Sequence, residues 1–153
     1  MTIERDDNYF MQEALKEAQK AAIENEVPIG AVLVLNNKIV ARSHNQTELL
    51  KDVTAHAEIL VITGAASELG IKFFEDFTLY VTLEPCTMCA GALKWARIGK
   101  IVYATDDPKA GFSLYSKNII HPKTIFEKGP GEKESKILLQ NFFKLRRKSD
   151  TKY

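Results

Sequence analysis

The chain has 153 residues, of which 45% are hydrophobic, and its 21 basic and 20 acidic side chains give a net charge of +1. This length and apolar content suit one globular domain over residues 1–153, without the ~18-residue apolar run that spans a bilayer and with an N-terminus too polar for a signal peptide. We therefore expect a cytoplasmic protein, in which any nucleic-acid contact has to come from a local basic patch.

The first part of the chain predicts a helix and a β-hairpin. Apolar residues recur at helical spacing over residues 6–25, and Pro28 prevents any continuation of this helix. Residues 30–35 form an almost unbroken apolar run that predicts a strand. Two asparagines then predict a turn, after which residues 38–44 return as a second strand.

Asn45 directly follows the second strand. A short polar residue in this place usually forms a turn, because Asn readily bonds its own backbone. Its amide can also donate and accept hydrogen bonds at once, which suits recognition of the edge of a purine base. Residues 46–53 are expected to be a polar loop that forms one wall of a pocket.

A second helix is expected over residues 55–69, with Thr54 as its N-cap and Gly70 at its end. It is expected to bury Ile59, Leu60, Ile62 and Ala66. The helix carries the sequence His56-Ala57-Glu58 in its first turn. Residues two apart do not share a helix face, so Glu58 is not expected to bind the same metal ion as His56.

Residues 77–83 are rich in β-branched and aromatic side chains and predict a central strand. Pro85 is expected to open a helix over residues 86–97. Cys86 and Cys89 then lie on one face of its first turn, where the positive end of the helix favours the thiolate form that binds metals.

His-x-Glu followed by Pro-Cys-x-x-Cys is a specific combination, although Cys-x-x-Cys alone also occurs in redox pairs. One imidazole and two thiolates, from His56, Cys86 and Cys89, make three zinc ligands and leave a fourth position for water, as catalytic zinc requires. Glu58 is then placed to move protons between that water and a substrate. The sequence thus predicts a catalytic zinc site of the type found in nucleobase deaminases.

The last part of the chain predicts a strand over residues 100–104, a short strand over residues 124–127 and a helix over residues 132–148. Asp107 follows the first of these strands at the end where ligands of α/β sheets collect, although a turn-forming Asp before Pro explains it equally well. The last helix is expected to direct Ile137, Leu138, Phe142 and Leu145 inward. Its basic end, with Lys144, Arg146, Arg147 and Lys148, suits either the helix dipole or contacts to phosphates.

This order of elements predicts an α/β fold, a three-layer α/β/α sandwich around a mixed sheet of about five strands. Four segments resemble the bacterial tRNA-specific adenosine deaminases, a family with the cytidine-deaminase-like architecture: residues 26–32 (EVPIGAV), 79–86 (LYVTLEPC), 96–98 (ARI) and 142–147 (FFKLRR). The resemblance extends from about Tyr9 to Arg147. It implies hydrolytic conversion of adenosine to inosine at the wobble position of a tRNA anticodon, by a homodimer that binds the anticodon stem-loop.

The resemblance also implies roles for single residues. His56, Cys86 and Cys89 would hold zinc, Glu58 would shuttle protons, Asn45 would hydrogen-bond the target base, and Asp107 would lie near its ribose. The basic end of the last helix, with Arg146 and Arg147, is the leading candidate for phosphate contacts. The chain departs from the family at Val53, where Pro is common, and in residues 111–122, which are shorter than usual.

Two alternatives stay open at this point. A deaminase of a free nucleobase such as guanine or cytosine would use the same zinc ligands and would suit the near-neutral charge. A non-catalytic zinc-binding domain would need neither Glu58 nor an open coordination position.

Overall fold

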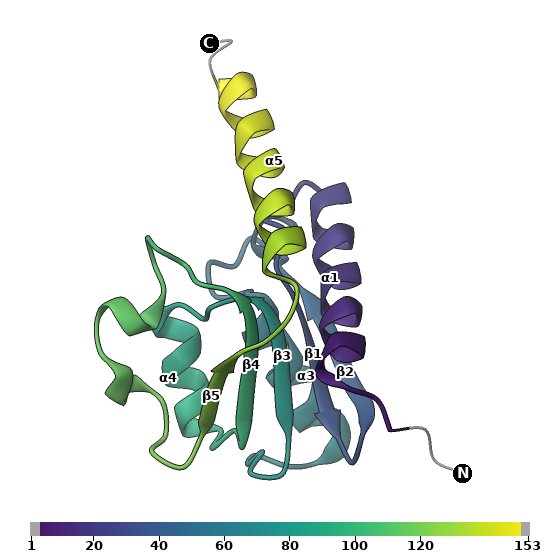
Figure 1. Ribbon diagram of the computed structural model, residues 1–153, viewed down its shortest axis with the longest axis vertical. Coiled ribbons are helices and arrows are strands. Elements are labelled where there is room, and N and C mark those ends of the chain that lie inside the picture. Colours follow the sequence, from purple (N-terminus) through teal and green to yellow (C-terminus); the bar gives the residue numbers. More distant parts are fainter. Residues whose placement is uncertain (1–3, 151–153) are drawn as a thin grey trace.

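The computed structural model describes residues 4–150, and the side chains of residues 4–147. Its centre is one mixed sheet with the strand order β2-β1-β3-β4-β5 (Figure 1). The strands are β1 (Gly30–Leu35), β2 (Lys38–His44), β3 (Thr78–Leu83), β4 (Lys100–Thr105) and β5 (Ile125–Lys128). β1 is antiparallel to both β2 and β3, whereas β3, β4 and β5 run parallel. The expected mixed five-stranded sheet is confirmed.

Alternating residues of the central strands face two separate cores, so the sheet is covered on both sides. On one face, Val32 and Val34 of β1 pack with α1 (Asp7–Ile23) and with Leu138 of α5 (Glu132–Asp150). On the other face, Ala31 and Leu33 pack with α3 (Ala57–Leu69) and α4 (Thr87–Trp95). The predicted three-layer arrangement follows from this alternation.

α1 lies unusually close to the start of β1. The Asp6 carboxylate caps the helix by accepting the backbone N–H of Tyr9 at 2.9 Å. Gly30 then faces the helix backbone, because a Cβ at this position would lie only 2.1 Å from the carbonyl oxygen of Ala14. A side chain cannot occupy that space, so Gly30 permits the contact that closes this layer over the sheet.

The two helices on the opposite face differ in detail from the sequence prediction. α3 begins at Ala57 with His56 as its N-cap, whereas Thr54, the expected cap, hydrogen-bonds the carboxylate of Asp52. Pro85 precedes the N-cap Cys86 rather than opening α4, which ends at Trp95. Both helices therefore begin slightly later than predicted, which places a metal-ligand candidate at each N-cap.

The buried face of α3 was predicted only in part: Ile62 and Ala66 pack against the core cluster as expected, but they are not fully buried. Val61 and Ala65 are fully buried against the sheet, one and two turns after Ala57. Four apolar residues expected in the core are only half-buried: Ile59, Leu60, Ile62 and Ala66. α3 is apolar around most of its circumference, so its sequence carries little information about which side meets the sheet.

α5 starts beside the end of the sheet and extends well beyond it (Figure 1). Phe142 is buried as predicted, and Leu138 packs against the core cluster formed with α1. Ile137 and Leu145, which were expected to face inward, are 46% and 68% exposed. Apolar residues therefore recur at helical spacing along α5 even beyond the part of the helix that packs on the core.

Two connecting segments contain short helices. Residues 46–53 were predicted to be a loop, but they include a four-residue helix, α2 (Thr47–Leu50). Residues 111–122 hold two 3₁₀ turns, at Phe112–Leu114 and Lys117–Ile119. Within residues 4–150, no helix is both long enough and apolar enough to cross a membrane.

Candidate metal centre

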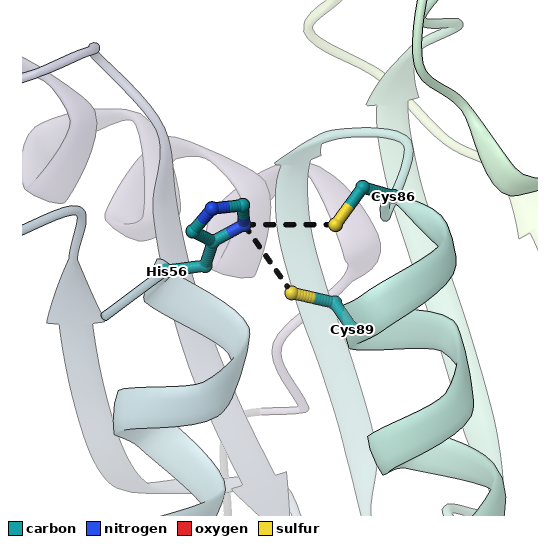
Figure 2. A group of neighbouring side chains, drawn as sticks. All are labelled: His56, Cys86 and Cys89. Carbon is teal, nitrogen blue, oxygen red and sulfur yellow. Dashed lines mark hydrogen bonds between the residues drawn. The ribbon is translucent and has the colours of Figure 1, made fainter. Parts of the chain in front are cut away.

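The structure brings His56, Cys86 and Cys89 together, although they are distant in the sequence. His56 and Cys86 are the N-caps of α3 and α4, and Cys89 lies in the first turn of α4 (Figure 2). The Nδ1 atom of His56 is 3.6 Å from the Sγ atom of Cys86 and 3.5 Å from that of Cys89. All three potential ligand atoms lie within 4.8 Å of one another.

The two N-cap residues do not use their side chains to cap their own helices. An N-cap side chain normally turns back to bind a free N–H of the first turn. Here the His56 ring and the Cys86 thiol point toward each other instead, across the gap between the two helix starts (Figure 2). Both helix starts therefore direct their positive ends and their ligand atoms to one point.

The protonation of the two thiols is coupled. A hydrogen bond from Cys89, together with one from His56, lowers the pKa of Cys86 to about 4. The same hydrogen bond with Cys86, together with burial, raises the pKa of Cys89 well above its ordinary value. The hydrogen bond with Cys86 also raises the pKa of His56. One thiolate is thus stabilised by its neighbours, whereas a second thiolate at this distance requires a cation.

This donor set fits zinc. One imidazole nitrogen and two thiolate sulfurs are the ligands that zinc prefers, and a divalent ion would neutralise both thiolates. Three ligands also leave one tetrahedral position for a water molecule or a substrate. The group could therefore hold a metal ion with an open position.

Glu58 lies in the first turn of α3 and is only 4% exposed. Its Oε1 atom is buried and has no hydrogen-bond partner among the described residues. Burial raises the pKa of this carboxyl to about 7. An unpaired buried oxygen is costly, so its presence beside the three ligand candidates indicates a polar partner that the protein chain does not itself supply.

Asn45 is buried, and its side-chain oxygen accepts the backbone N–H of Ala57 at 3.0 Å. Its own backbone N–H donates to the carbonyl oxygen of Ile29 at 3.1 Å. Asn45 thus fixes the start of α3 to the end of β2. One acceptor position of the amide is used in this way.

The other predicted substrate contacts are not part of this cluster. The Oδ1 atom of Asp107 accepts the backbone N–H groups of Lys109 and Ala110, each at 3.0 Å, so this oxygen closes a turn. Arg146 approaches the carboxylate of Glu48 at 3.8 Å, and Arg147 is exposed on α5. The side chain of Lys148 lies outside the described residues.

Glu84 has a structural role that the sequence reasoning missed, since only its backbone was considered. Its Oε1 atom accepts the N–H of Asp107 at 3.1 Å, and its Oε2 atom accepts the N–H and the hydroxyl of Ser113 at 3.1 and 2.6 Å. Glu84 thereby fixes the loop after β4 beside the start of α4. A glutamate that ends an apolar strand was the available signal, because such a residue is buried only when it has partners.

A sizeable hollow on the surface lies away from the three ligand candidates. It measures about 700 Å³ and lies at the opposite ends of α3 and α4, where Ile62, Phe73, Trp95 and Arg97 help to line it. It contains none of the three ligand candidates and does not include Glu58. The hollow therefore belongs to another surface of the molecule.

The chain is similar in sequence and in structure to known deaminases. The sequence profile of the MafB19-like deaminases matches residues 5–147. A tRNA-specific adenosine deaminase of Agrobacterium fabrum is 46% identical over 147 residues, which cover 93% of this chain and 97% of the relative. A solved structure from work on A-to-I editing by tRNA:A34 deaminases at the wobble position of transfer RNA is 46% identical, with a TM-score of 0.80, and the match covers 86% of this chain and 99% of that one.

A guanine deaminase of Bacillus subtilis is also similar in structure. It is 35% identical, with a TM-score of 0.64, but the match covers only 67% of this chain and 66% of that one. Both its coverage and its TM-score are lower than those of the tRNA-related structure.

Replacing either thiol tests the metal-ligand set. We expect Cys86→Ala and Cys89→Ala each to lose bound zinc and to unfold at a lower temperature, because metal binding stabilises the fold that forms the site. Zinc content by atomic absorption and Tm by circular dichroism measure both effects. His121→Ala, which removes a histidine away from the cluster, is the control and should keep its zinc. Full zinc content and an unchanged Tm in either cysteine variant would contradict the assignment.

Proposed function

The chain belongs to the deaminase family that includes the bacterial tRNA-specific adenosine deaminases, and from this premise we propose that it converts adenosine to inosine at the wobble position of a tRNA anticodon. The reaction is hydrolytic: a bond forms between a water oxygen and C6 of adenine, the bond from C6 to the amino nitrogen breaks, and ammonia leaves. We propose zinc as the cofactor, held by His56, Cys86 and Cys89.

The unpartnered Oε1 atom of Glu58 is the observation that carries the proposed mechanism. When bound, zinc supplies Lewis-acid activation, which lowers the pKa of water toward ~7 and so provides a nucleophile at neutral pH. In this proposal Glu58 accepts the proton of the attacking water at Oε1. The same carboxyl then donates a proton to N1 of the ring, and a second transfer through it protonates the amino group as it leaves.

The other residues of the site orient the nucleotide. The amide nitrogen of Asn45 would donate to the target base, while its oxygen remains bonded to Ala57. Asp107 would reach the ribose through Oδ2, because Oδ1 is used in the turn. An anticodon loop presents its bases unpaired, so bringing one of them into the site costs less than it would in a duplex.

Replacing Glu58 tests the proton-transfer role. Glu58→Gln keeps the size of the side chain but cannot accept the proton, so we expect kcat/KM for an anticodon stem-loop to fall by at least ~10²–10⁴. Zinc content should stay the same. Glu68→Gln, an exposed glutamate on the same helix, should behave like the parent. Turnover of Glu58→Gln within a few-fold of the parent would place the proton shuttle on another group.

The substrate itself distinguishes two functions. A free guanine deaminase is the second candidate, because the Bacillus subtilis enzyme is similar over two thirds of this chain. A tRNA substrate carries phosphates, and the chain has a net charge of only +1. Its phosphate contacts would therefore depend on few residues, and we propose Arg146 and Arg147 at the end of α5 as the leading ones.

Salt dependence tests this part of the proposal. Each lost phosphate contact lowers the slope of log affinity against log salt by about 0.7–0.9, so Arg146→Ala/Arg147→Ala should raise KM for the stem-loop and flatten its salt dependence. Lys16→Ala/Lys38→Ala removes the same charge elsewhere and serves as the control. Deamination of a free base should not respond. A parent that is insensitive to salt, deaminates guanine and leaves the stem-loop unchanged would overturn the tRNA assignment.

We also propose that the protein acts as a homodimer in the cytoplasm. The outward side of α3 and α4 supports a dimer: Ile62 and Ala66 are half-exposed there, Trp95 is 80% exposed, and the hollow of about 700 Å³ lies beside them. The hollow is lined by Trp95 and other apolar side chains together with Lys72, Lys94 and Arg97, and exposed apolar groups of this kind commonly mark a protein contact. A second copy packed on it would leave the metal-ligand cluster uncovered, because the hollow contains none of the three ligand candidates.

Replacing the exposed tryptophan tests the dimer. Trp95→Glu should shift the protein toward monomer in sedimentation equilibrium, because it puts a charge into an apolar contact. Ile23→Glu changes an equally exposed apolar residue at the end of α1 and should leave the association unchanged. A monomeric parent would rule out the dimer, and a dimeric Trp95→Glu protein would place the contact on another surface.

A further inference from the structure

Glu26 is one of the most deeply buried charged residues of the described chain, with an exposed fraction of 1%. It lies just after α1, where its backbone N–H donates to the carbonyl oxygen of Ala21 at 2.8 Å. Its side chain reaches across to α2. The Oε1 atom accepts the N–H of Glu48 at 3.0 Å, and the Oε2 atom accepts the N–H of Leu49 at 2.8 Å.

These two hydrogen bonds replace the cap that α2 lacks. Gln46 is the N-cap of α2, but its side chain makes no capping hydrogen bond. The N–H groups of a first helical turn have no partner within the helix, and a helix of four residues is not stable by itself. Both donors that Glu26 binds belong to this first turn. The conformation of α2 therefore depends on a carboxylate more than twenty residues earlier in the chain.

α2 lies between the groups assigned to chemistry and to substrate contact. Asn45 lies two residues before Thr47, where α2 begins, and His56 lies six residues after Leu50, where it ends. The N–H of Gln46 also bonds the carbonyl oxygen of Ala55 at 3.0 Å, which closes the segment into a compact loop. At its outer side, Glu48 approaches Arg146 at 3.8 Å. A shift of α2 would thus move the surroundings of the base and of a proposed phosphate contact together.

The segment also exposes an apolar surface. Leu49 is 66% exposed and Val53 is 84% exposed, and Leu50 is exposed as well. Single exposed apolar residues are common, but three within five positions beside a site indicate contact with a ligand. Nucleobases next to the target could pack on this surface, since base faces are apolar.

We propose that Glu26 is a positioning residue of the deaminase site, which holds α2 in the place where the nucleotides around the target base contact it. This inference rests on the proposed function. Glu26 touches neither the base nor the metal-ligand cluster in this proposal. Its loss should therefore weaken substrate binding more than it slows the chemical step.

Glu26→Gln is the primary variant. Glutamine has nearly the same volume, but its amide offers one acceptor oxygen in place of two, so one N–H of the first turn of α2 loses its partner. We expect KM for the anticodon stem-loop to rise about tenfold, the factor expected for a lost hydrogen bond to a charged group. We expect kcat to change less than about threefold and zinc content not to change. Glu26→Asp, which keeps the charge on a shorter side chain, is the second variant and should show an effect of the same kind.

Amide hydrogen exchange provides a measurement that needs no substrate. The N–H groups of Glu48 and Leu49 should exchange faster in Glu26→Gln than in the parent, while the amides of β3 keep their protection. Ser135→Ala is the matched control, because it also removes one buried hydrogen bond, from the Ser135 hydroxyl to the carbonyl oxygen of Thr82 at 2.7 Å. It should lower stability without changing exchange in α2 or KM.

The outcomes separate the inference from the proposed function. Unchanged exchange at residues 48 and 49 in both Glu26 variants would overturn the inference, as would faster exchange with an unchanged KM. An equal rise of KM in Ser135→Ala would overturn it too, because the effect would then reflect a general loss of stability. A parent that does not deaminate the stem-loop would refute the proposed function, and KM would then be measured with guanine. An unchanged KM for guanine in Glu26→Gln would overturn the inference for that substrate.

Discussion

The convergence of two helix starts on one point is the constraint on which the rest of the site depends. α3 and α4 lie side by side on one face of the sheet, and each begins with an N-cap residue whose side chain points to the other helix. Their N–H dipoles add positive potential at the place where two thiols, an imidazole and a buried carboxyl meet. Neither helix could shift along its axis without separating His56 from Cys86, so the packing of both against the sheet core fixes the geometry of the cluster.

Three buried glutamates, Glu26, Glu84 and Glu58, differ in the hydrogen bonds that their carboxylate oxygens accept. Both carboxylate oxygens of Glu26 accept backbone N–H groups, and so do both oxygens of Glu84. Each of these residues fixes a loop beside the cluster, α2 in one case and residues 107–113 in the other. Glu58 is equally buried, but its Oε1 atom has no partner in the part of the chain that the structure describes. A carboxylate whose oxygens are all hydrogen-bonded holds structure in place, whereas the unpartnered oxygen of Glu58 suits the proton transfer that we propose for it.

The sequence predicted those features that depend on neighbouring residues. The five strands, the αL residue Gly70 after α3 and the pairing of His56 with Cys86 and Cys89 all follow from local patterns or from a specific motif. The features that it missed depend on residues far apart in the chain. α2 was predicted to be a loop because its cap is Glu26, which no local rule connects to Glu48. The inward side of α3 was assigned only in part because most of its circumference is apolar, and the angle at which the helix meets the sheet buries Val61 fully but Ile62 only partly.

A net charge of +1 limits how this protein can bind a polyanion. A strongly basic protein gains most of its affinity for RNA from phosphate contacts, whose strength falls with salt. With few such contacts available, more of the affinity in the proposed reaction has to come from the fit of one extruded base and its neighbours to the walls of the site. In the proposed reaction that fit would depend on Asn45, which is bonded to the start of α3, and on the apolar side chains of α2, a helix with almost no stability of its own. Under our proposal, the buried hydrogen bonds of Glu26 matter for recognition because the electrostatic attraction is weak.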